Sequence, residues 1–236
     1  TVQVSDGVTT ANRVISVNVG PATPGAPDLA ANSDSGSSGV DNITNADALN
    51  FSGASAGGDS ASSVRVFLDK NDNGVFDAGD VSATATVANG SWTVNGLSTT
   101  GLSDGDYNVY AQVTATTGAL TSSLSSGLVV HIDKTGPGQT VGSLSLSADS
   151  GGSASDFITK TAAQTISATL SGALASGDVL HGSLDGGSTW TDITSKVSGT
   201  TVTWDGVTLS GSDRLQMRVV DAAGNGGTIA SQNYTL

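Results

Sequence analysis

A polar loop of 12 residues, 69–80, lies between two segments that have strand patterns. Upstream, residues 63–68 alternate and then become continuously apolar, with β-branched and aromatic side chains. Downstream, residues 81–87 alternate strictly, as a half-buried strand does. Neither flank has the 3.6-residue period of a helix. The loop is therefore predicted to join two β-strands, which excludes a helix–loop–helix arrangement.

The order of residues within this loop is that of a calcium-binding loop. Oxygen-bearing side chains occupy the first, third, fifth, ninth and twelfth positions, glycine occupies the sixth, and the seventh residue would supply a backbone carbonyl. In order, these residues are Asp69, Asn71, Asn73, Asp77 and Asp80, with Gly74 at the turn and Val75 as the carbonyl donor. We therefore expect Ca²⁺ as the cofactor; the alternative is a solvated acidic turn.

The last ligand position indicates what sort of calcium site this is. Asp80 stands where calcium sensors usually place a bidentate glutamate, so we expect weaker binding or altered geometry. Dissociation constants of about 10⁻⁴ to 10⁻³ M are typical of extracellular modules. A loop between strands also cannot open a helical groove as sensors do. The ion is predicted to be structural.

The composition supports an all-β protein. All 21 acidic residues are aspartate, which favours turns and ion sites, whereas glutamate favours helices. A net charge of −13 with eight basic residues argues against nucleic acid and anionic membranes as partners. No apolar stretch approaches the roughly 20 residues of a membrane-inserted helix. Without cysteine, metal ions are the available cross-links.

An internal repeat divides the chain. Asp-Ser-Gly at 34–36, followed by Asp-x-Ile-Thr at 41–44, recurs 115 residues later at 149–151 and 156–159. This period fits immunoglobulin-like sandwiches of about 100 residues. We predict tandem Ig-like antiparallel β-sandwiches in a linear array, within a longer parent protein. The predicted parts are the C-terminal hairpin of a truncated preceding domain plus linker at 1–22, an Ig-like domain with the calcium loop at 23–134, and an Ig-like domain at 135–236.

Within these domains, strand patterns and one corner motif can be placed. Tyr107 stands two residues before the core position Val109, as in the tyrosine corner of such sandwiches. The two strands of the N-terminal hairpin are predicted at 1–5 and 13–19. The predicted strands of the two full domains lie near 48–52, 63–69, 81–87, 91–94, 105–115, 120–132, 164–170, 178–184, 189–193, 200–204, 206–210, 213–221 and 228–235.

Several of these segments also carry a family resemblance. The stretches VFLDKNDNGVFDAGD, DGDYNVYAQ, VVHIDKTGP and VVDAAGN are similar to the bacterial Ig-like repeats of giant type I-secreted adhesins, the biofilm-associated and repeats-in-toxin kind. The resemblance covers residues 23–236. It implies a rod on the bacterial cell surface, with neighbouring repeats of the same chain as partners and calcium at domain junctions. The first full domain departs from the pattern at 114–118, where the second has Asp-Ala-Ala-Gly-Asn.

Aspartates at the ends of the predicted domains are further candidates for calcium. Asp133 ends one domain, and Asp149 and Asp156 open the next, so these carboxylates are expected to gather at one pole. They would repel one another by about 1 kcal/mol per pair 4 Å apart in water, and a cation would reverse that sign. Two alternatives remain, an ion within each Asp-Ser-Gly element or a solvated turn. The candidates for these polar or interdomain sites are Asp34, Asp41, Asp133, Asp149, Asp156 and Asp221.

No motif in the sequence predicts an enzyme. Residues 183–190 match the Asp-box of sialidases, which in that family is a hairpin element away from the catalytic centre. His131 and His181 have no nearby cysteine or second histidine, which argues against zinc. A Gly-x-Ser-x-Gly elbow and a phosphate loop are absent from the sequence.

Two functions remain open from the sequence. The favoured one is a structural extension segment of a secreted adhesin that supports adhesion or biofilm formation. The alternative is a carbohydrate-binding accessory module of an extracellular enzyme or adhesin, which needs exposed aromatic side chains. The aromatic residues that would serve it are Trp92, Trp190, Trp204, Tyr107 and Tyr110.

Overall fold

The computed structural model describes most of the chain. It describes all residues other than 1, 6, 9, 14–19, 56–61 and 117–119. By its contacts the chain divides into two compact units. The first unit comprises 1–28, 50–98 and 108–128, and the second comprises 29–49, 99–107 and 129–236. This division does not follow the predicted domain boundaries, which stay a prediction.

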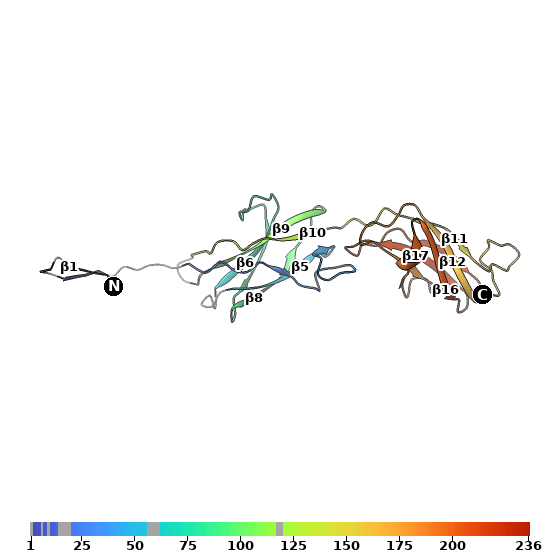
Figure 1. Ribbon diagram of the computed structural model, residues 1–236, viewed down its shortest axis with the longest axis horizontal. Helices are drawn as coiled ribbons and strands as arrows, with labels where there is room; N and C mark the ends of the chain where they lie inside the picture. Colours follow the sequence, from blue (N-terminus) through green and yellow to red (C-terminus); the bar gives the residue numbers. More distant parts are fainter. Residues whose placement is uncertain (1, 6, 9, 14–19, 56–61, 117–119) are drawn as a thin grey trace. The chain divides into compact units, whose positions relative to one another are not determined.

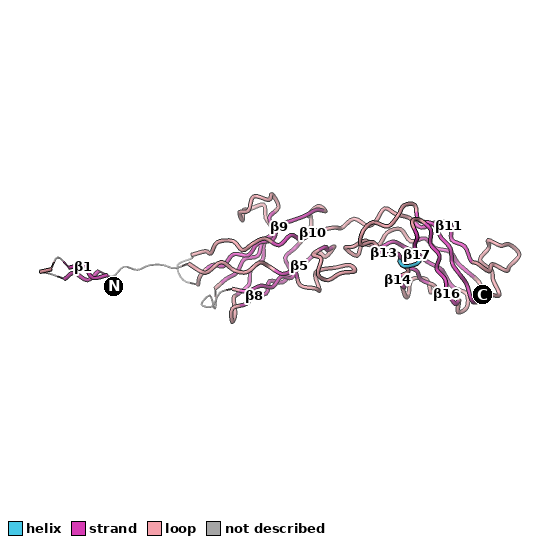
Figure 2. The backbone as a smooth tube through the Cα atoms, viewed as in Figure 1, coloured by secondary structure: helices cyan, strands magenta, loops and turns pink. Residues whose placement is uncertain are grey.

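Strands and loops make up almost all of the described structure (Figures 1 and 2). A short 3₁₀ turn, Thr194–Lys196, is the one helical segment in the described part of the chain, and none there is long and apolar enough to cross a membrane. The strands are β1 Val2–Ser5, β2 Thr10–Arg13, β3 Asp28–Leu29, β4 Ile43–Thr44, β5 Ala48–Ala54, β6 Ser63–Asp69, β7 Val81–Thr86, β8 Ser91–Ser98, β9 Gly105–Thr114, β10 Leu128–Ile132, β11 Val141–Leu146, β12 Ala163–Leu170, β13 Val179–Ser183, β14 Thr191–Asp192, β15 Val197–Ser198, β16 Thr201–Thr208, β17 Asp213–Val220 and β18 Ala230–Tyr234.

The first sandwich comprises a five-stranded sheet, β4-β10-β9-β6-β7, and a three-stranded sheet, β3-β5-β8. Strand β6 lies between β7 and β9, and Val66 is opposite Ala83 on one side and Ala111 on the other. Alternating residues of β8 are buried, which is the two-residue period of a strand with one face on a core. The fully buried side chains include Leu49, Phe51, Val64, Val66, Phe67, Val109, Val113, Val130 and Ile132.

The second sandwich comprises two four-stranded sheets, β11-β12-β16-β15 and β14-β13-β17-β18. Aliphatic side chains of both sheets form one core with Phe157 and Tyr234. The fold class is thus tandem Ig-like antiparallel β-sandwiches, as predicted. The core residues with essentially no exposure are Ile166, Leu180, Val202, Leu215, Met217 and Val219.

Four details of the fold differ from the sequence prediction. Strands β4 and β10 pair in parallel, with His131 opposite Ile43, so the first sandwich is not entirely antiparallel. The sequence analysis missed β11 and the two-residue strands β3, β4 and β15, which are too short to show a period. The strand expected at 120–132 is confined to Leu128–Ile132. The two strands expected at 200–204 and 206–210 are one, β16, with a left-handed Gly206 inside it.

The predicted N-terminal hairpin is present in part. Val2–Ser5 pairs antiparallel with Thr10–Arg13. The second strand was expected at 13–19, and residues 14–19 lie outside the described part of the chain.

The predicted tyrosine corner is confirmed. The hydroxyl of Tyr107 donates to the backbone carbonyl of Ser103 at 2.9 Å, and Val109, two residues further on, is fully buried. This bond ties the start of β9 to the segment before it.

Candidate functional site

The loop 69–80 begins and ends on paired strands. Leu68, the residue before the last of β6, is opposite Val81 at the start of β7, so the two ends of the loop are held side by side. Asp69, the last residue of β6, is 2% exposed. A carboxylate so buried at a strand end requires hydrogen-bond partners, since an unpaired buried charge is costly.

The carboxylate of Asp69 has its partners in the loop itself. Its Oδ2 accepts the backbone N–H of Gly74 at 2.7 Å, and its Oδ1 accepts those of Asn71 and Asn73 at 3.3 Å each. Asp72 and Gly74 have left-handed backbones, with φ of 54° and 68°. The loop therefore coils round the first predicted ligand, and the glycine at the sixth position provides the turn that the sequence predicted.

The third, fifth and ninth positions of the loop converge. The side-chain amides of Asn71 and Asn73 both donate to Asp77 Oδ2, at 2.9 and 3.1 Å. Asp77 Oδ1 accepts the N–H of Gly79 at 2.8 Å. The Gly79 hydrogen bond, followed by that of Asn71, lowers the pKa of the Asp77 carboxyl, so this half-buried group is an anion at neutral pH.

Asp80, the twelfth residue, closes the loop on itself. Its Oδ1 accepts the N–H of Lys70 at 3.0 Å, and its Oδ2 accepts the N–H of Asp77 at 2.9 Å. Val75, the predicted carbonyl donor, has a 59% exposed side chain, and its N–H donates to Asn73 Oδ1 at 2.8 Å. All six predicted ligand residues thus belong to one hydrogen-bonded coil.

The donor set of this coil fits a hard cation that prefers oxygen. Calcium takes six to eight oxygens at 2.3–2.6 Å from carboxylates, amides and carbonyls. Turning over the amides of Asn71 and Asn73 would direct their oxygens to the place where their nitrogens now meet Asp77. The described residues contain no group of three or more His, Cys, Asp or Glu side chains placed to hold a metal. An ion here would therefore depend on amide and backbone oxygens as well as carboxylates.

The first Asp-Ser-Gly element, residues 34–45, is a compact hydrogen-bonded turn. Asp34 is 5% exposed; its Oδ2 accepts the N–H of Asn42 at 3.1 Å, and Asp41 Oδ1 accepts that of Ile43 at 3.1 Å. Burial first, with a contribution from the Asp41 charge, raises the pKa of Asp34. Its Oδ1 is buried and has no hydrogen-bond partner among the described residues.

The second element, residues 149–160, repeats this arrangement. Asp149 Oδ2 accepts the N–H of Phe157 at 2.9 Å, and Asp156 Oδ1 accepts that of Ile158 at 3.0 Å. Phe157 has φ of 61°, and its counterpart in the first element, Asn42, has 59°. Asp149 Oδ1 is likewise buried, without a partner in the described part of the chain. The repeat found in the sequence is thus a repeat of backbone conformation.

Asp133 and Asp221 are brought together by a residue that the sequence analysis did not single out. Asn225 Nδ2 donates to the backbone carbonyl of Asp133 at 2.9 Å and to Asp221 Oδ2 at 3.0 Å. The Asn225 N–H donates to Asp221 Oδ1 at 2.8 Å. Asn225 is the last residue of the Asp-Ala-Ala-Gly-Asn motif. The motif was recognisable in the sequence, but the contacts of Asn225 with Asp133 and Asp221 were not.

The expectation that Asp133 gathers with Asp149 and Asp156 is wrong. Asp133 donates its N–H to the carbonyl of Thr44, in the first element. The second element is tied instead to the other end of the sandwich, where Ile158 bridges Thr235 beside the first residue of β17. Asp221 follows the last residue of β17, and eight residues of strand span about 25 Å. Asp221, with Asp133 close to it, and the second element are therefore at opposite ends of β17.

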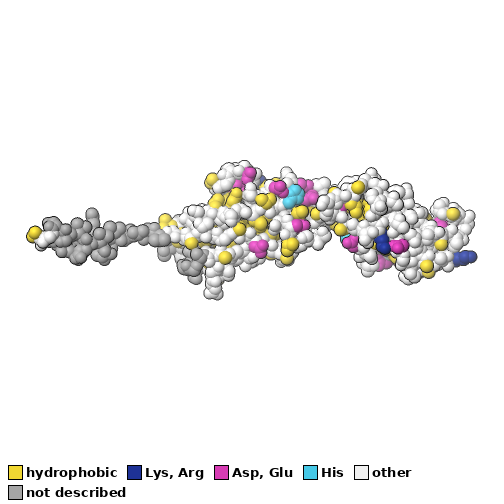
Figure 3. Space-filling model, in the orientation of Figure 1, with side chains coloured by type: hydrophobic (Ala, Val, Ile, Leu, Met, Phe, Trp, Pro, Cys, Tyr) yellow, Lys and Arg dark blue, Asp and Glu magenta, His cyan; other side chains and the backbone are white. Residues whose placement is uncertain are grey.

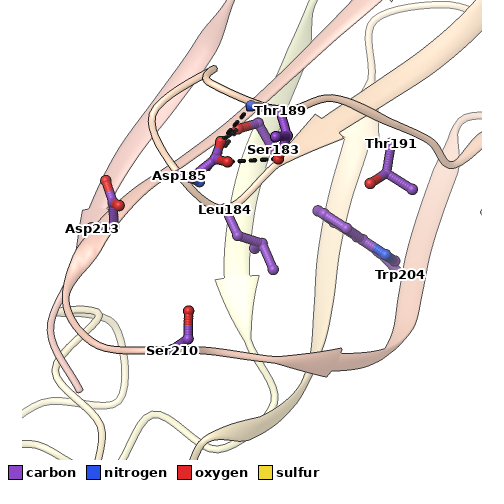
Figure 4. A pocket seen from close by; sticks show the side chains of 8 residues that line it. All are labelled: Ser183, Leu184, Asp185, Thr189, Thr191, Trp204, Ser210 and Asp213. Carbon is purple, nitrogen blue, oxygen red and sulfur yellow. Dashed lines mark hydrogen bonds between the residues drawn. The ribbon is translucent and has the colours of Figure 1, made fainter.

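The Asp-box residues form a hairpin, as predicted. Asp185 accepts hydrogen bonds from the Thr189 hydroxyl at 2.6 Å, the Thr189 N–H at 2.9 Å and the Ser183 hydroxyl at 2.7 Å (Figure 4). These bonds, led by that of the Thr189 hydroxyl, lower the pKa of Asp185 to about 2. Because its carboxylate is used to hold the turn, Asp185 serves the hairpin. The hollow beside it is lined by Ser183, Leu184, Asp185, Thr189, Thr191, Trp204, Ser210 and Asp213.

The aromatic side chains needed for carbohydrate binding have partners within the fold. Trp92 is 3% exposed, the guanidinium of Arg218 lies 4.3 Å from the ring of Trp190, and Tyr110 packs against Phe67. Trp204 lines the hollow of Figure 4 and is half-buried.

The two histidines lie in different surroundings. His131 Nδ1 is 2.6 Å from Asp106 Oδ1. His181 packs near the ring of Trp190, and burial, followed by the charge of Arg218, lowers the pKa of His181.

Residues 21–134 match the family model of the bacterial Ig-like domain. The resemblance seen in the sequence is therefore confirmed for this part of the chain at the level of a bacterial Ig-like repeat. Ig-like families are typically non-catalytic, and bacterial Ig-like domains are common in extracellular or surface proteins. The search of curated proteins gives no match.

Three solved structures that resemble this chain have low sequence identity to it. The FN1–FN3 domains of chicken CNTN1 are 11% identical, with a TM-score of 0.43, covering 92% of this chain and 69% of that one. An I-band fragment of titin is 14% identical, with a TM-score of 0.34 and coverages of 93% and 66%. The C-terminal domain of the Streptococcus pyogenes antigen I/II-family protein AspA is 9% identical, with a TM-score of 0.34 and coverages of 90% and 99%.

Proposed function

We propose that this chain, which carries a bacterial Ig-like domain at residues 21–134, is a structural extension segment of a secreted or cell-surface bacterial adhesin. Its tandem sandwiches would be stiffened by Ca²⁺ and would support adhesion or biofilm formation at the cell surface. The observation that carries the proposal is the coil 69–80, in which the third, fifth and ninth residues meet at one carboxylate.

The location of this coil suits a structural ion. The loop joins adjacent strands of the five-stranded sheet, and its first ligand, Asp69, is buried and hydrogen-bonded to three backbone N–H groups. When bound, a divalent cation would supply positive charge among carboxylates and amide oxygens. The chain's own contribution is to hold Asp69, Asp77 and Asp80 in one coil through backbone hydrogen bonds.

The polar aspartates are secondary candidates within the same proposal. Asp34 offers a buried Oδ1 that lacks a partner in the described structure, next to the carboxylate of Asp41. Asp149 has an equivalent oxygen. Both oxygens of Asp221 are already taken by Asn225. This favours ions within each Asp-Ser-Gly element over an ion shared between Asp133 and Asp221.

The negative surface charge of the chain suits an environment that contains calcium. On the face seen in Figure 3, acidic side chains are spread over the surface and basic ones are sparse. With a formal net charge of −13, the chain would repel copies of itself, and bound calcium would reduce that repulsion.

The carbohydrate-binding alternative has less support. It requires several aromatic rings on one accessible face, whereas Trp92 is buried and Trp190 is covered by Arg218. Trp204 beside the hollow of Figure 4 is the remaining candidate platform. Titration of a broad glycan panel against the whole chain tests this alternative, and binding that is lost in Trp204→Ala would establish it.

Thermal unfolding of the whole chain in 10 mM calcium and in chelator tests the main proposal. A cation bound only by the folded chain stabilises it by mass action. For a dissociation constant of about 10⁻⁴ to 10⁻³ M, this stabilisation is about 1.4 to 2.7 kcal/mol. Asp77→Asn should remove most of it. The matched control is Asp72→Asn, which changes the same charge in the same loop at a position outside the ligand pattern.

Two outcomes of this experiment decide the proposal. A calcium-dependent rise in melting temperature that Asp77→Asn loses and Asp72→Asn keeps supports a structural ion in this loop. Equal melting in calcium and chelator contradicts it. Calorimetric stoichiometry then separates one site from several, and scattering in both conditions tests whether calcium stiffens the chain.

A further inference from the structure

The two Asp-Ser-Gly elements share a hydrogen-bond network in addition to their sequence. In the first, Ser35 Oγ accepts the N–H of Asn45 at 2.8 Å, and the Thr44 hydroxyl donates to the carbonyl of Ser33 at 2.6 Å. In the second, Ser150 Oγ accepts the N–H of Lys160 at 2.9 Å, and the Thr159 hydroxyl donates to the carbonyl of Ala148 at 2.5 Å. Each bond recurs 115 residues later, so the two turns have equivalent shapes.

Within the second compact unit, the first element holds the loop 221–225. The hydroxyl of Ser35 donates to the carbonyl of Ala223 at 2.6 Å, and Asn45 Nδ2 donates to Asn225 Oδ1 at 3.0 Å. Gly36 is in close contact with this loop, since a β-carbon there would lie 1.8 Å from the Ala222 carbonyl oxygen. Hydroxyl, amide and glycine together form a surface that receives a backbone carbonyl.

In the second element the proton of the corresponding hydroxyl, that of Ser150, has only a long contact. A hydroxyl carries one proton. That of Thr159 is directed to Ala148, so the contact of 3.3 Å between Ser150 Oγ and Thr159 Oγ1 can use the proton of Ser150 alone. The equivalent contact of Ser35 with Thr44 is also 3.3 Å, and there Ser35 makes its much shorter bond to Ala223. Ser150 is exposed, so its hydroxyl can donate to an incoming carbonyl in the same way.

We propose that residues 149–160 form a docking surface for a further Ig-like domain of the same kind, placed after Leu236. The occupant is its loop equivalent to residues 221–225, which would present a backbone carbonyl to Ser150. Lys160 stands where Asn45 stands in the first element, so the incoming side chain would be an acceptor, either an amide oxygen or a carboxylate. The inference rests on the proposed function of a tandem extension segment and identifies the surface through which one repeat receives the next.

The strand register shows how to build the test. Ile43 is opposite His131 and Ile158 is opposite Thr235, so Thr235 corresponds to His131 and Leu236 to Ile132. A second copy of residues 133–236, joined directly after Leu236, therefore continues the chain in the register that follows Ile132. The whole present chain is retained in this extended protein.

Amide hydrogen exchange of the present chain and of the extended chain provides the readout. Residues 149–160 should exchange about tenfold more slowly in the extended chain, because their local opening would then also break the new contact. Residues 34–45, which already hold their loop, serve as the internal reference. Unchanged exchange at 149–160 in a folded extended chain overturns the proposal.

A glycine pair in the added copy provides the matched variants. Gly224 has φ of 93°, and a β-carbon added there would lie 3.1 Å from the backbone of Gly36. Gly211 has a similar φ of 88°, and a β-carbon added there would meet nothing. Gly224→Ala in the added copy should abolish the protection, and Gly211→Ala, with equal backbone strain, should retain it. Loss of protection in both variants would assign the effect to the folding of the added copy and contradict a specific contact.

The two proposals fail separately. If calcium stabilises the chain while residues 149–160 remain unprotected in the extended protein, the docking surface is wrong and the calcium-stiffened segment stands. If residues 149–160 are protected in the extended protein but calcium has no effect on thermal stability, the docking surface stands and the proposed structural role of the ion is wrong.

Discussion

Trp92 packs directly against Gly53. A β-carbon at Gly53 would lie 2.2 Å from Cζ2 of the indole, and the indole Nε1 donates to the carbonyl of Ala54 at 3.3 Å. The ring therefore occupies the space of the absent side chain, and its one polar atom is satisfied by the next residue. This fixes Trp92 in the core of the first sandwich.

Gly53→Ala should destabilise the first sandwich. The added methyl group cannot fit without moving the indole, and overpacking of this kind costs about 1–3 kcal/mol. Chemical unfolding followed by tryptophan fluorescence measures the change. Gly172→Ala is the control, since nothing lies near its β-carbon position; equal stability of both variants would contradict the close packing.

Tyr107→Phe should lower stability by about 0.5–1.5 kcal/mol, the net value of one hydrogen bond. The change removes the bond from the Tyr107 hydroxyl to the Ser103 carbonyl and leaves the ring in place. Equilibrium denaturation compares it with Tyr110→Phe, the same chemical change three residues further along β9. An effect no larger than that of the control would show that the corner contributes nothing.

Asp69→Ala should destabilise the chain even in chelator. Three backbone N–H groups of the loop, those of Asn71, Asn73 and Gly74, would lose their acceptor, at a cost of about 1–3 kcal/mol. Thermal unfolding in chelator measures this, with the exposed Asp28→Ala as control. If Asp69→Ala matched the control in chelator, the coil would have no role apart from an ion.

Asp185→Asn should have an effect that depends on pH. The folded pKa of about 2 lies below the unfolded value of about 3.9, so the ionised group contributes stability above pH 4 that is lost as pH falls towards 2. The stability difference between the wild-type chain and the variant should therefore shrink over this range. Asp213→Asn, at the edge of the same hollow, is the control; a difference independent of pH would argue against the Asp185 hydrogen bonds.

Asp34→Asn should show the opposite pH dependence. Burial raises the folded pKa of Asp34 above its unfolded value, so its stabilising contribution is present at low pH and is lost as pH rises through the folded pKa. Relative to the wild-type chain, the variant should gain stability between pH 3 and pH 7 in chelator. Unfolding curves across that range, with Asp28→Asn alongside, measure the trend, and a relative loss on raising the pH would refute it.

Much of the fold followed from local sequence patterns. Long alternating segments such as 63–69 and 105–114 form β6 and β9, because apolar side chains at every second residue lie on one face of a strand and can pack on a core. Strands β3 and β4 are two residues long, too short for a period, and pairing with a distant strand defines them. The parallel pairing of β4 with β10 joins residues almost 90 positions apart, which no local pattern indicates.

For the candidate site, the local sequence was sufficient to predict the coil 69–80. Its ligand order, its glycine turn and its flanking strands are all local, because hydrogen bonds from neighbouring N–H groups to Asp69, Asp77 and Asp80 need no distant partner. Which distant aspartates lie close together depends on the folded arrangement of the strands. It placed Asp133 beside Asn225 and carried Asp149 to the opposite end of β17, since the direction and pairing of strands fix contacts between residues far apart in the chain.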